Sequence, residues 1–145
     1  MVSPDPTTLA ALVDDLADAV VIADPGGVIV YWNCAAERLF GWSRDEALGQ
    51  TLDLIIPERH RKAHGDGYAK VMATGETRYA SDLLQVPCLH ADGERRSIAF
   101  TVTLLTDSND NVIGIAAVVR DETERRAEER ALRQQLEAMT EAGTS

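Results

Sequence analysis

The chain has 145 residues, of which 45% are hydrophobic and 26% charged, and its formal net charge is −10. This length suits one domain with appendages, and the composition is that of a globular rather than a disordered chain. The excess of acidic residues argues against a nucleic-acid-binding surface, because affinity for phosphate groups comes mainly from Lys and Arg.

The sequence carries no signal for a membrane or for export. No apolar run approaches the roughly 20 residues that span a bilayer, and the N-terminal segment lacks the basic start and apolar block of a signal peptide. We therefore predict a cytoplasmic protein that does not bind a membrane. Its two cysteines, Cys34 and Cys88, lack CxxC spacing, so we expect free thiols rather than a disulfide framework or a zinc site.

An amphipathic helix is predicted near the N-terminus. Residues 7–18 carry apolar side chains at helical spacing, including Leu9 and Leu12. Asp5 can cap this helix and Pro6 suits its first position. Because the stripe must cover another surface, we place Leu9 and Leu12 in a dimer interface.

Two strands and two short helices are predicted next. β-Branched runs at 19–24 and 28–32 flank a Pro-Gly-Gly turn, a pattern typical of a hairpin. Asn33 can cap the first short helix, and Ser43 with Glu46 three residues later forms a capping box for the second. A glycine follows each helix and can end it.

A longer helix is predicted to begin at Pro57 and to run to about residue 75, since proline favours the first position of a helix. Gly65 and Gly67 lie in its middle, where each costs roughly 1 kcal/mol relative to Ala. We therefore expect this helix to be weak or kinked.

Beyond this helix the hydrophobic period changes to two. Runs at 80–91, 95–105 and 112–121 are separated by turn-forming clusters and predict three long strands in an antiparallel meander. Pro87 favours an edge position for the first of these strands, and His90 beside the following turn is expected to be exposed. The apolar face of the middle run carries Ile98, Phe100, Val102 and Leu104.

A charge-dense helix is predicted from residue 121 towards the C-terminus. Leu132, Leu136 and Met139 have the spacing of a coiled-coil seam, and the stripe is too narrow for a core helix. We expect this exit helix to leave the domain and to pair with a second copy of the chain, which makes the protein a homodimer.

Together these elements predict an α+β domain at 19–120, between a cap at 1–18 and a signalling helix with its tail at 121–145. Its five-stranded antiparallel sheet carries short helices on one face and, curled round them, encloses a cavity. The aliphatic lining suits either a collapsed core or an apolar guest. The strand residues expected to line it are Ile98, Phe100, Val102, Ile113 and Ile115.

The order of the elements and several motifs resemble the PAS, or sensory-box, family. The matching stretches cover about residues 14–126 and include DAVVIADPGGVIVYWNCAAERLFGWSRDEALGQ, LIIPERHR, ATGE, HADGERRSIAF and GIAAVVRDETERR. The resemblance implies a PAS fold and a sensor or interaction module rather than an enzyme. The residues agree, since there is no nucleophile elbow, Walker loop or HExxH motif.

The leading hypothesis is a signalling module that senses a small ligand or redox state in the cavity. A change there shifts the packing of the last strand, and the exit helix carries the shift onward. No kinase or cyclase region follows that helix, so we expect output through an unidentified downstream signalling protein. The chain is then either a stand-alone PAS protein or an excised N-terminal domain. The alternative is a ligand-free dimerisation scaffold.

One cofactor hypothesis depends on His64. It lies seven positions after Pro57 and resembles the proximal, iron-binding histidine of haem-PAS domains in the oxygen-sensing histidine kinases of nodule bacteria. The resemblance implies a haem with an apolar distal side, because Leu84 takes the position of the family's oxygen-contacting arginine. The residues expected to contact this cofactor are His64, Tyr68, Arg61, Leu84, Ile98, Phe100 and Ile115, with Arg59, Lys62 and Arg78 as further partners for the propionates.

Other hypotheses for the same region stay open. His60 and His64 could share a metal ion with Glu58 or Asp66, although two ligands are not a site and a solvated, basic helix start is the simpler interpretation of His60. His64 itself could be an ordinary histidine that packs on its helix. Cys34 invites comparison with light-oxygen-voltage flavin domains, but it lies on an earlier helix, so we assign it a packing role.

Overall fold

A computed structural model describes residues 3–76 and 84–143. One antiparallel sheet has the strand order β2-β1-β5-β4-β3, which confirms the predicted five-stranded α+β fold. The last strand in sequence therefore lies at the centre of the sheet. The strands are β1 (Ala19–Ala23), β2 (Ile29–Trp32), β3 (Leu84–Leu89), β4 (Arg95–Thr106) and β5 (Val112–Asp121).

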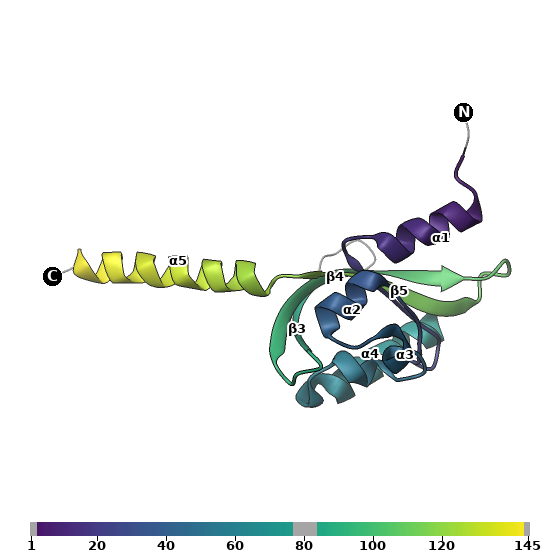
Figure 1. The fold of residues 1–145 in the computed structure, drawn as a ribbon. Helices are drawn as coiled ribbons and strands as arrows, with labels where there is room; N and C mark the ends of the chain where they lie inside the picture. The colour runs from purple at the N-terminus through teal and green to yellow at the C-terminus, as the bar shows by residue number, and fades with distance from the viewer. Residues whose placement is uncertain (1–2, 77–83, 144–145) are drawn as a thin grey trace.

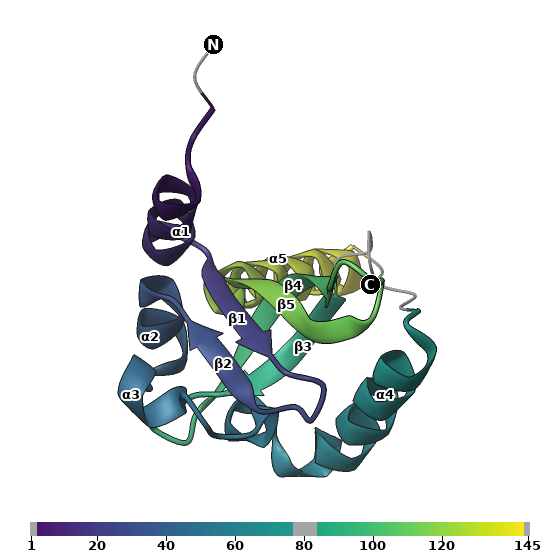
Figure 2. The same cartoon turned by 90° about the vertical axis from the view of Figure 1, so that its right-hand side faces the viewer.

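Helices flank the sheet and extend from it. Figure 2 shows α2 and α3 at the left of the curled sheet, beside β2, and α4 at the right. In Figure 1, α5 extends away from the rest of the domain. Within the described ranges, no helix combines the length and the apolarity needed to cross a bilayer. The helices are α1 (Pro6–Asp15), α2 (Cys34–Phe40), α3 (Arg44–Ala47), α4 (Arg61–Thr74) and α5 (Thr123–Ala142), with 3-10 turns η1 (Leu52–Ile55) and η2 (Glu58–His60).

The predicted helix caps are confirmed. The Asp5 side chain accepts a hydrogen bond from the Thr8 backbone, and Ser43 and Glu46 form a complete capping box at α3. Asn33 caps α2, which ends at Gly41 in the left-handed conformation (φ 81°). The structure differs in two bounds, because α1 ends at Asp15 and the 3-10 turn η2 precedes α4.

The side chain of Asn33 is fully buried and makes four hydrogen bonds to backbone groups. Its Oδ1 accepts from Val20 N at 2.8 Å and from Ala36 N at 3.0 Å. Its Nδ2 donates to Val13 O at 2.9 Å and Asp18 O at 3.1 Å. One amide thus joins the end of α1, the start of β1 and the first turn of α2.

The hydrophobic core lies between α2 and the inner face of the sheet. Trp32 and Phe40 are fully buried, and their ring centroids are 5.2 Å apart. Ile98 of β4 and Val119 of β5 belong to the same cluster, so the core joins both halves of the sheet. The predicted meander is confirmed, and Pro87 lies on the edge strand β3 as expected.

Two predictions for the strands and their turns are wrong. Ile113 is 52% exposed, because it is the extra residue at the register shift opposite Leu105 and Thr106. His90 is not exposed either, since only 15% of its side chain is accessible and its ring packs over Gly41. A Cβ added at Gly41 would come within 2.5 Å of this imidazole, so a long-range contact decides the environment of His90.

We predict that Asn33→Ala lowers the free energy of unfolding by about 3 kcal/mol, because it removes a helix cap and leaves buried backbone groups without partners. Urea denaturation at constant m-value measures this change. Asn109→Ala in the exposed turn between β4 and β5 is the control and should stay within about 0.5 kcal/mol of the wild type. Equal midpoints for the two variants would contradict the central role of Asn33.

Candidate functional site

A cavity of about 500 Å³ lies between the sheet and the segment from η1 to α4. This volume is in the range of about 300–1,000 Å³ typical of small-molecule sites. The inner face of β4 and β5 forms its floor, and Leu52, Ile56 and Ala63 face the floor from the helical side. Almost all of this lining is aliphatic or aromatic, so the cavity suits an apolar body. The floor residues are Ile98, Phe100, Val102, Ile115, Ala117 and Val119.

Six of the seven residues predicted to contact a cofactor line this cavity: His64, Tyr68, Leu84, Ile98, Phe100 and Ile115. Arg61 is the exception. Its Nε donates to the Ile56 carbonyl at 3.0 Å, so its guanidinium is used locally to close the turn before α4. Arg78 lies outside the described residues.

His64 lies at the open edge of the cavity, where its ring lines the wall although the residue as a whole is exposed. Partial burial of the imidazole lowers its pKa, and the negative charge of Asp53 opposes this shift in part. The neutral form is therefore favoured near pH 7. A neutral imidazole is the form that binds a metal.

His60 also lines the cavity, contrary to the prediction of a solvated position. Its Nε2 accepts a hydrogen bond from Arg59 Nε at 3.2 Å. The i, i+4 spacing with His64 was the sequence signal for a shared face. Neither Glu58 nor Asp66 joins these histidines in a group of potential ligands within the described chain.

Tyr68 connects α4 to the turn between β1 and β2. Its hydroxyl donates to the Asp24 carbonyl, and its ring centroid lies 5.9 Å from that of His64. Burial and the nearby Asp24 charge raise the pKa of this phenol to about 12, so it remains a hydrogen-bond donor across the physiological range.

Cys88 is a cavity residue that the sequence did not single out. It lies on β3 with 1% exposure, and its burial raises the pKa of the thiol to about 11. It carries no flanking motif, so only the strand register places it in the wall. Both Cys34 and Cys88 are free thiols.

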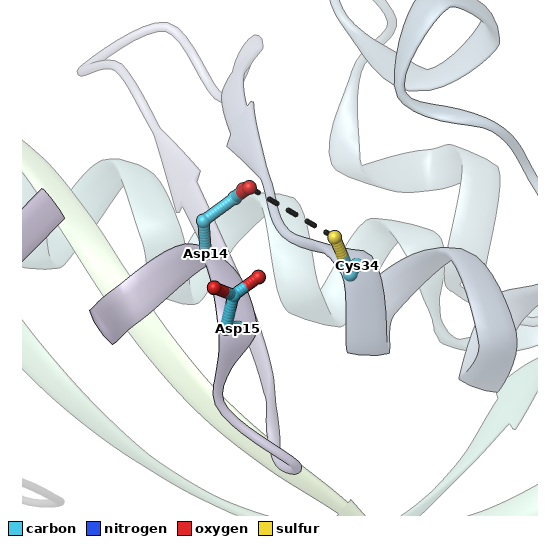
Figure 3. A group of neighbouring side chains, drawn as sticks. All are labelled: Asp14, Asp15 and Cys34. Atoms are coloured by element: carbon cyan, nitrogen blue, oxygen red, sulfur yellow. Dashed lines mark hydrogen bonds between the residues drawn. The ribbon is translucent and has the colours of Figure 1, made fainter. Parts of the chain in front are cut away.

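One group of potential metal ligands occurs in the described chain, at Asp14, Asp15 and Cys34 on α1 and α2 (Figure 3). The carboxylate of Asp14 already has hydrogen-bond partners. It accepts from Tyr31 Oη at 3.1 Å, from the Arg44 guanidinium and from Cys34 Sγ at 3.9 Å. We interpret the group as a tie between α1 and α2 rather than as a metal centre.

The junction between the sheet and α5 is held by reciprocal hydrogen bonds to Ser97 of β4. Ser97 N donates to Thr123 Oγ1 at 3.0 Å, and Glu122 N donates to Ser97 O at 2.8 Å. Asp121 accepts from Thr123 N at 2.8 Å and lies 4.0 Å from Arg96. The start of α5 is therefore fixed to both strands of the cavity floor.

Comparison with known proteins identifies the family. A sequence model of the family described as the PAS fold matches residues 13–127. The sensor protein FixL of Bradyrhizobium diazoefficiens is 36% identical over 70 residues, which cover 48% of this chain and 14% of FixL. The oxygen sensor protein DosP of Escherichia coli is 26% identical over 129 residues, which cover 89% of this chain and 16% of DosP. This chain therefore corresponds to a small part of each of these relatives.

A solved structure agrees in fold. The PAS domain of a protein from Colwellia psychrerythraea superposes with a TM-score of 0.71 at 23% sequence identity. The match covers 81% of this chain and 97% of the other.

We predict that iodoacetamide at pH 8 modifies Cys34 at least tenfold faster than Cys88. Cys34 is partly exposed, whereas the raised pKa keeps Cys88 as an unreactive thiol. Mass spectrometry of tryptic peptides gives both rates, and unfolding in urea should make them similar. Burial of the neutral Cys88 thiol also makes the free energy of unfolding depend on pH. Its contribution is complete below the ordinary pKa of about 8.5 and is lost as the pH rises towards 11, where the buried thiol ionises. Equal rates in the folded protein would contradict the position of Cys88.

Proposed function

The chain belongs to the PAS family, and on that premise we propose that it is a sensory module whose cavity binds a small ligand and whose exit helix α5 transmits the bound state. The observation that carries this proposal is the position of the cavity floor. Ile98 of β4 and Val119 of β5 face the ligand space, while their neighbours in the same strands hold the start of α5. A ligand that displaces this floor thus also displaces the root of the helix.

The transmission needs only small movements. Ser97 is adjacent to Ile98 and contacts Thr123 through its backbone on both sides, at 3.0 Å from N and 3.4 Å from O to Thr123 Oγ1. A shift of β4 relative to β5 changes these hydrogen bonds at once. A ligand that binds only one arrangement of the strands therefore selects one orientation of α5.

Haem is the first ligand to test, because the residues present fit its main requirements. The floor is apolar, His64 would offer a neutral imidazole to the iron, and Leu84 adds a further apolar side chain to the lining. Arg59 is exposed, and although its Nε donates to His60 Nε2, the rest of its guanidinium could meet a propionate. When bound, haem would supply an iron centre that binds a gas or changes redox state. An apolar lining would favour a bound gas that needs no hydrogen bond from the protein.

We predict that wild-type protein reconstituted with hemin gives a Soret band distinct from free hemin, and that His64→Ala removes it. His60→Ala is the matched control, since it deletes the other imidazole in the wall and should keep the band. Visible spectra of hemin titrations measure both. Because the lowered pKa keeps His64 neutral, the wild-type spectrum should persist as the pH falls to 6.5 and be lost at lower values. Identical spectra for His64→Ala and wild type would exclude His64 as the iron ligand.

A ligand-free dimerisation scaffold is the second candidate, and the exposed apolar stripes on the terminal helices favour it. Leu9 and Leu12 of α1 are 47% and 55% exposed. Leu132, Leu136 and Met139 of α5 are 59%, 65% and 71% exposed. Side chains of this kind are expected to be covered in an assembly.

We predict that replacing Leu132, Leu136 and Met139 together by Gln converts a homodimer to monomer. The change removes the apolar seam while keeping good helix formers. Light scattering coupled to size exclusion measures the mass. Gln134→Ser on the opposite face of α5 is the control and should leave the dimer intact. A dimer of unchanged mass in the triple variant would contradict the role of this seam.

A further inference from the structure

Helix α4 forms one wall of the cavity, and this wall is packed less closely than the floor, which the sheet forms. No residue of α4 is buried, although Ala63, His64 and Tyr68 line the cavity. By contrast, β5 pairs with β4 from Val112 to Asp121, apart from the register shift at Ile113, and with β1 from Ile115 to Val119. The cavity therefore has one wall with little packing of its own, and low local stability is expected there.

In the described part of the chain, a single side-chain hydrogen bond joins this wall to the sheet. Among the described side chains of α4, only Tyr68 hydrogen-bonds to a strand or to a turn between strands, at the Asp24 carbonyl. Arg61 bonds back to Ile56, and Thr74 bonds within the helix to Lys70. Removing the Tyr68 hydroxyl thus removes the only polar link between α4 and the sheet within residues 3–76 and 84–143.

The acceptor of this bond is held firmly. The Asp24 carboxylate accepts from Gly26 N at 2.9 Å and Val28 N at 3.0 Å, which fixes the turn. The preceding Ala23 lies against Gly114 of β5, where an added Cβ would meet the Ala23 carbonyl oxygen at 2.6 Å. The anchor therefore belongs to the rigid part of the fold.

The helix itself is soft beside the link. Gly65 and Gly67 lie between the start of α4 and Tyr68, and a Cβ at either position would meet nothing within 4 Å. Packing therefore does not require glycine here. Two glycines in a helix interior weaken it, whereas alanine at the same positions would strengthen it without a clash.

We propose that α4 is a lid on the cavity, made pliable by Gly65 and Gly67 and held closed by the hydrogen bond from Tyr68 to the Asp24 carbonyl. The proposal rests on the ligand-binding function above and adds a route for entry. When the bond breaks, Tyr68 and His64 leave the wall together, since they lie one turn apart with ring centroids separated by 5.9 Å. Closure returns His64 to the cavity, so Tyr68 is a positioning residue for this imidazole.

Hydrogen–deuterium exchange of the ligand-free protein tests the lid directly. Tyr68→Phe keeps the ring and removes the bond, and it should raise exchange of the amides at 61–74 about fivefold without raising that of β4 and β5. Gly65→Ala with Gly67→Ala should slow the same amides at least tenfold. Tyr31→Phe, which removes the bond to Asp14 at the α1–α2 tie, is the matched control and should leave α4 unchanged. Unchanged exchange of α4 in Tyr68→Phe, or an equal rise throughout the sheet, would overturn the proposal.

Stopped-flow binding of 8-anilinonaphthalene-1-sulfonate, an anionic fluorescent probe with an apolar aromatic body, tests the lid as an entrance. Association and dissociation rates should both rise about fivefold in Tyr68→Phe and both fall in the double alanine variant. Rates equal to wild type in both variants would overturn the entrance role. If neither this probe nor hemin binds any variant, the ligand-binding function fails, while the exchange experiment still decides whether α4 opens.

Discussion

The buried amide of Asn33 is the interaction on which the arrangement of this domain depends. Its four partners are backbone groups of α1, β1, α2 and the turn between α1 and β1, so the bonds do not depend on the side chains of these segments. By fixing the start of β1 against the first turn of α2, it sets the position at which Trp32 and Phe40 meet. A hydrophobic contact alone is non-directional and would allow these elements to slide.

The same constraint passes along β1 to the cavity. Its far end, at Ala23, is pressed against Gly114 of β5, and the adjoining turn is tied by the Asp24 carboxylate. Three residues of α2 are thus buried against the sheet, whereas α4 has no buried residue. The cavity thus has a floor of paired strands and one wall, α4, with little packing of its own, which is the arrangement that the proposed lid requires.

Local sequence rules predicted most of the fold, because helix caps and glycines close to each boundary determine where the elements begin and end. The caps at Asp5, Asn33 and Ser43, the left-handed glycine after α2 and the period-two strands were all readable within a few residues. The features that were missed depend on long-range contacts. His90 is covered by the distant Gly41, and Ile113 is displaced by a register shift that its own sequence does not reveal.

The candidate site shows the same division. Periodicity along β4 placed Ile98 and Phe100 on the floor, and helical spacing could have placed His60 beside His64. Arg61 was assigned to the cavity because of its charge, yet a carbonyl five residues earlier takes its guanidinium. Which partner a long side chain chooses depends on three-dimensional proximity, and helical spacing limits only its direction. Haem binding likewise depends on how side chains meet in three dimensions, and it stays a prediction.

The proposed mechanism does not depend on the identity of the ligand, because it acts through the central strand β5. One end of β5 holds Gly114 against Ala23, next to the anchor of Tyr68, and the other end leads through Asp121 into α5. Between them, Ile115, Ala117 and Val119 form part of the cavity floor. A guest that presses on the floor and one that only alters how α4 closes both act on this strand. Because a packed sheet responds by shifting between discrete arrangements, either event can change the root of α5.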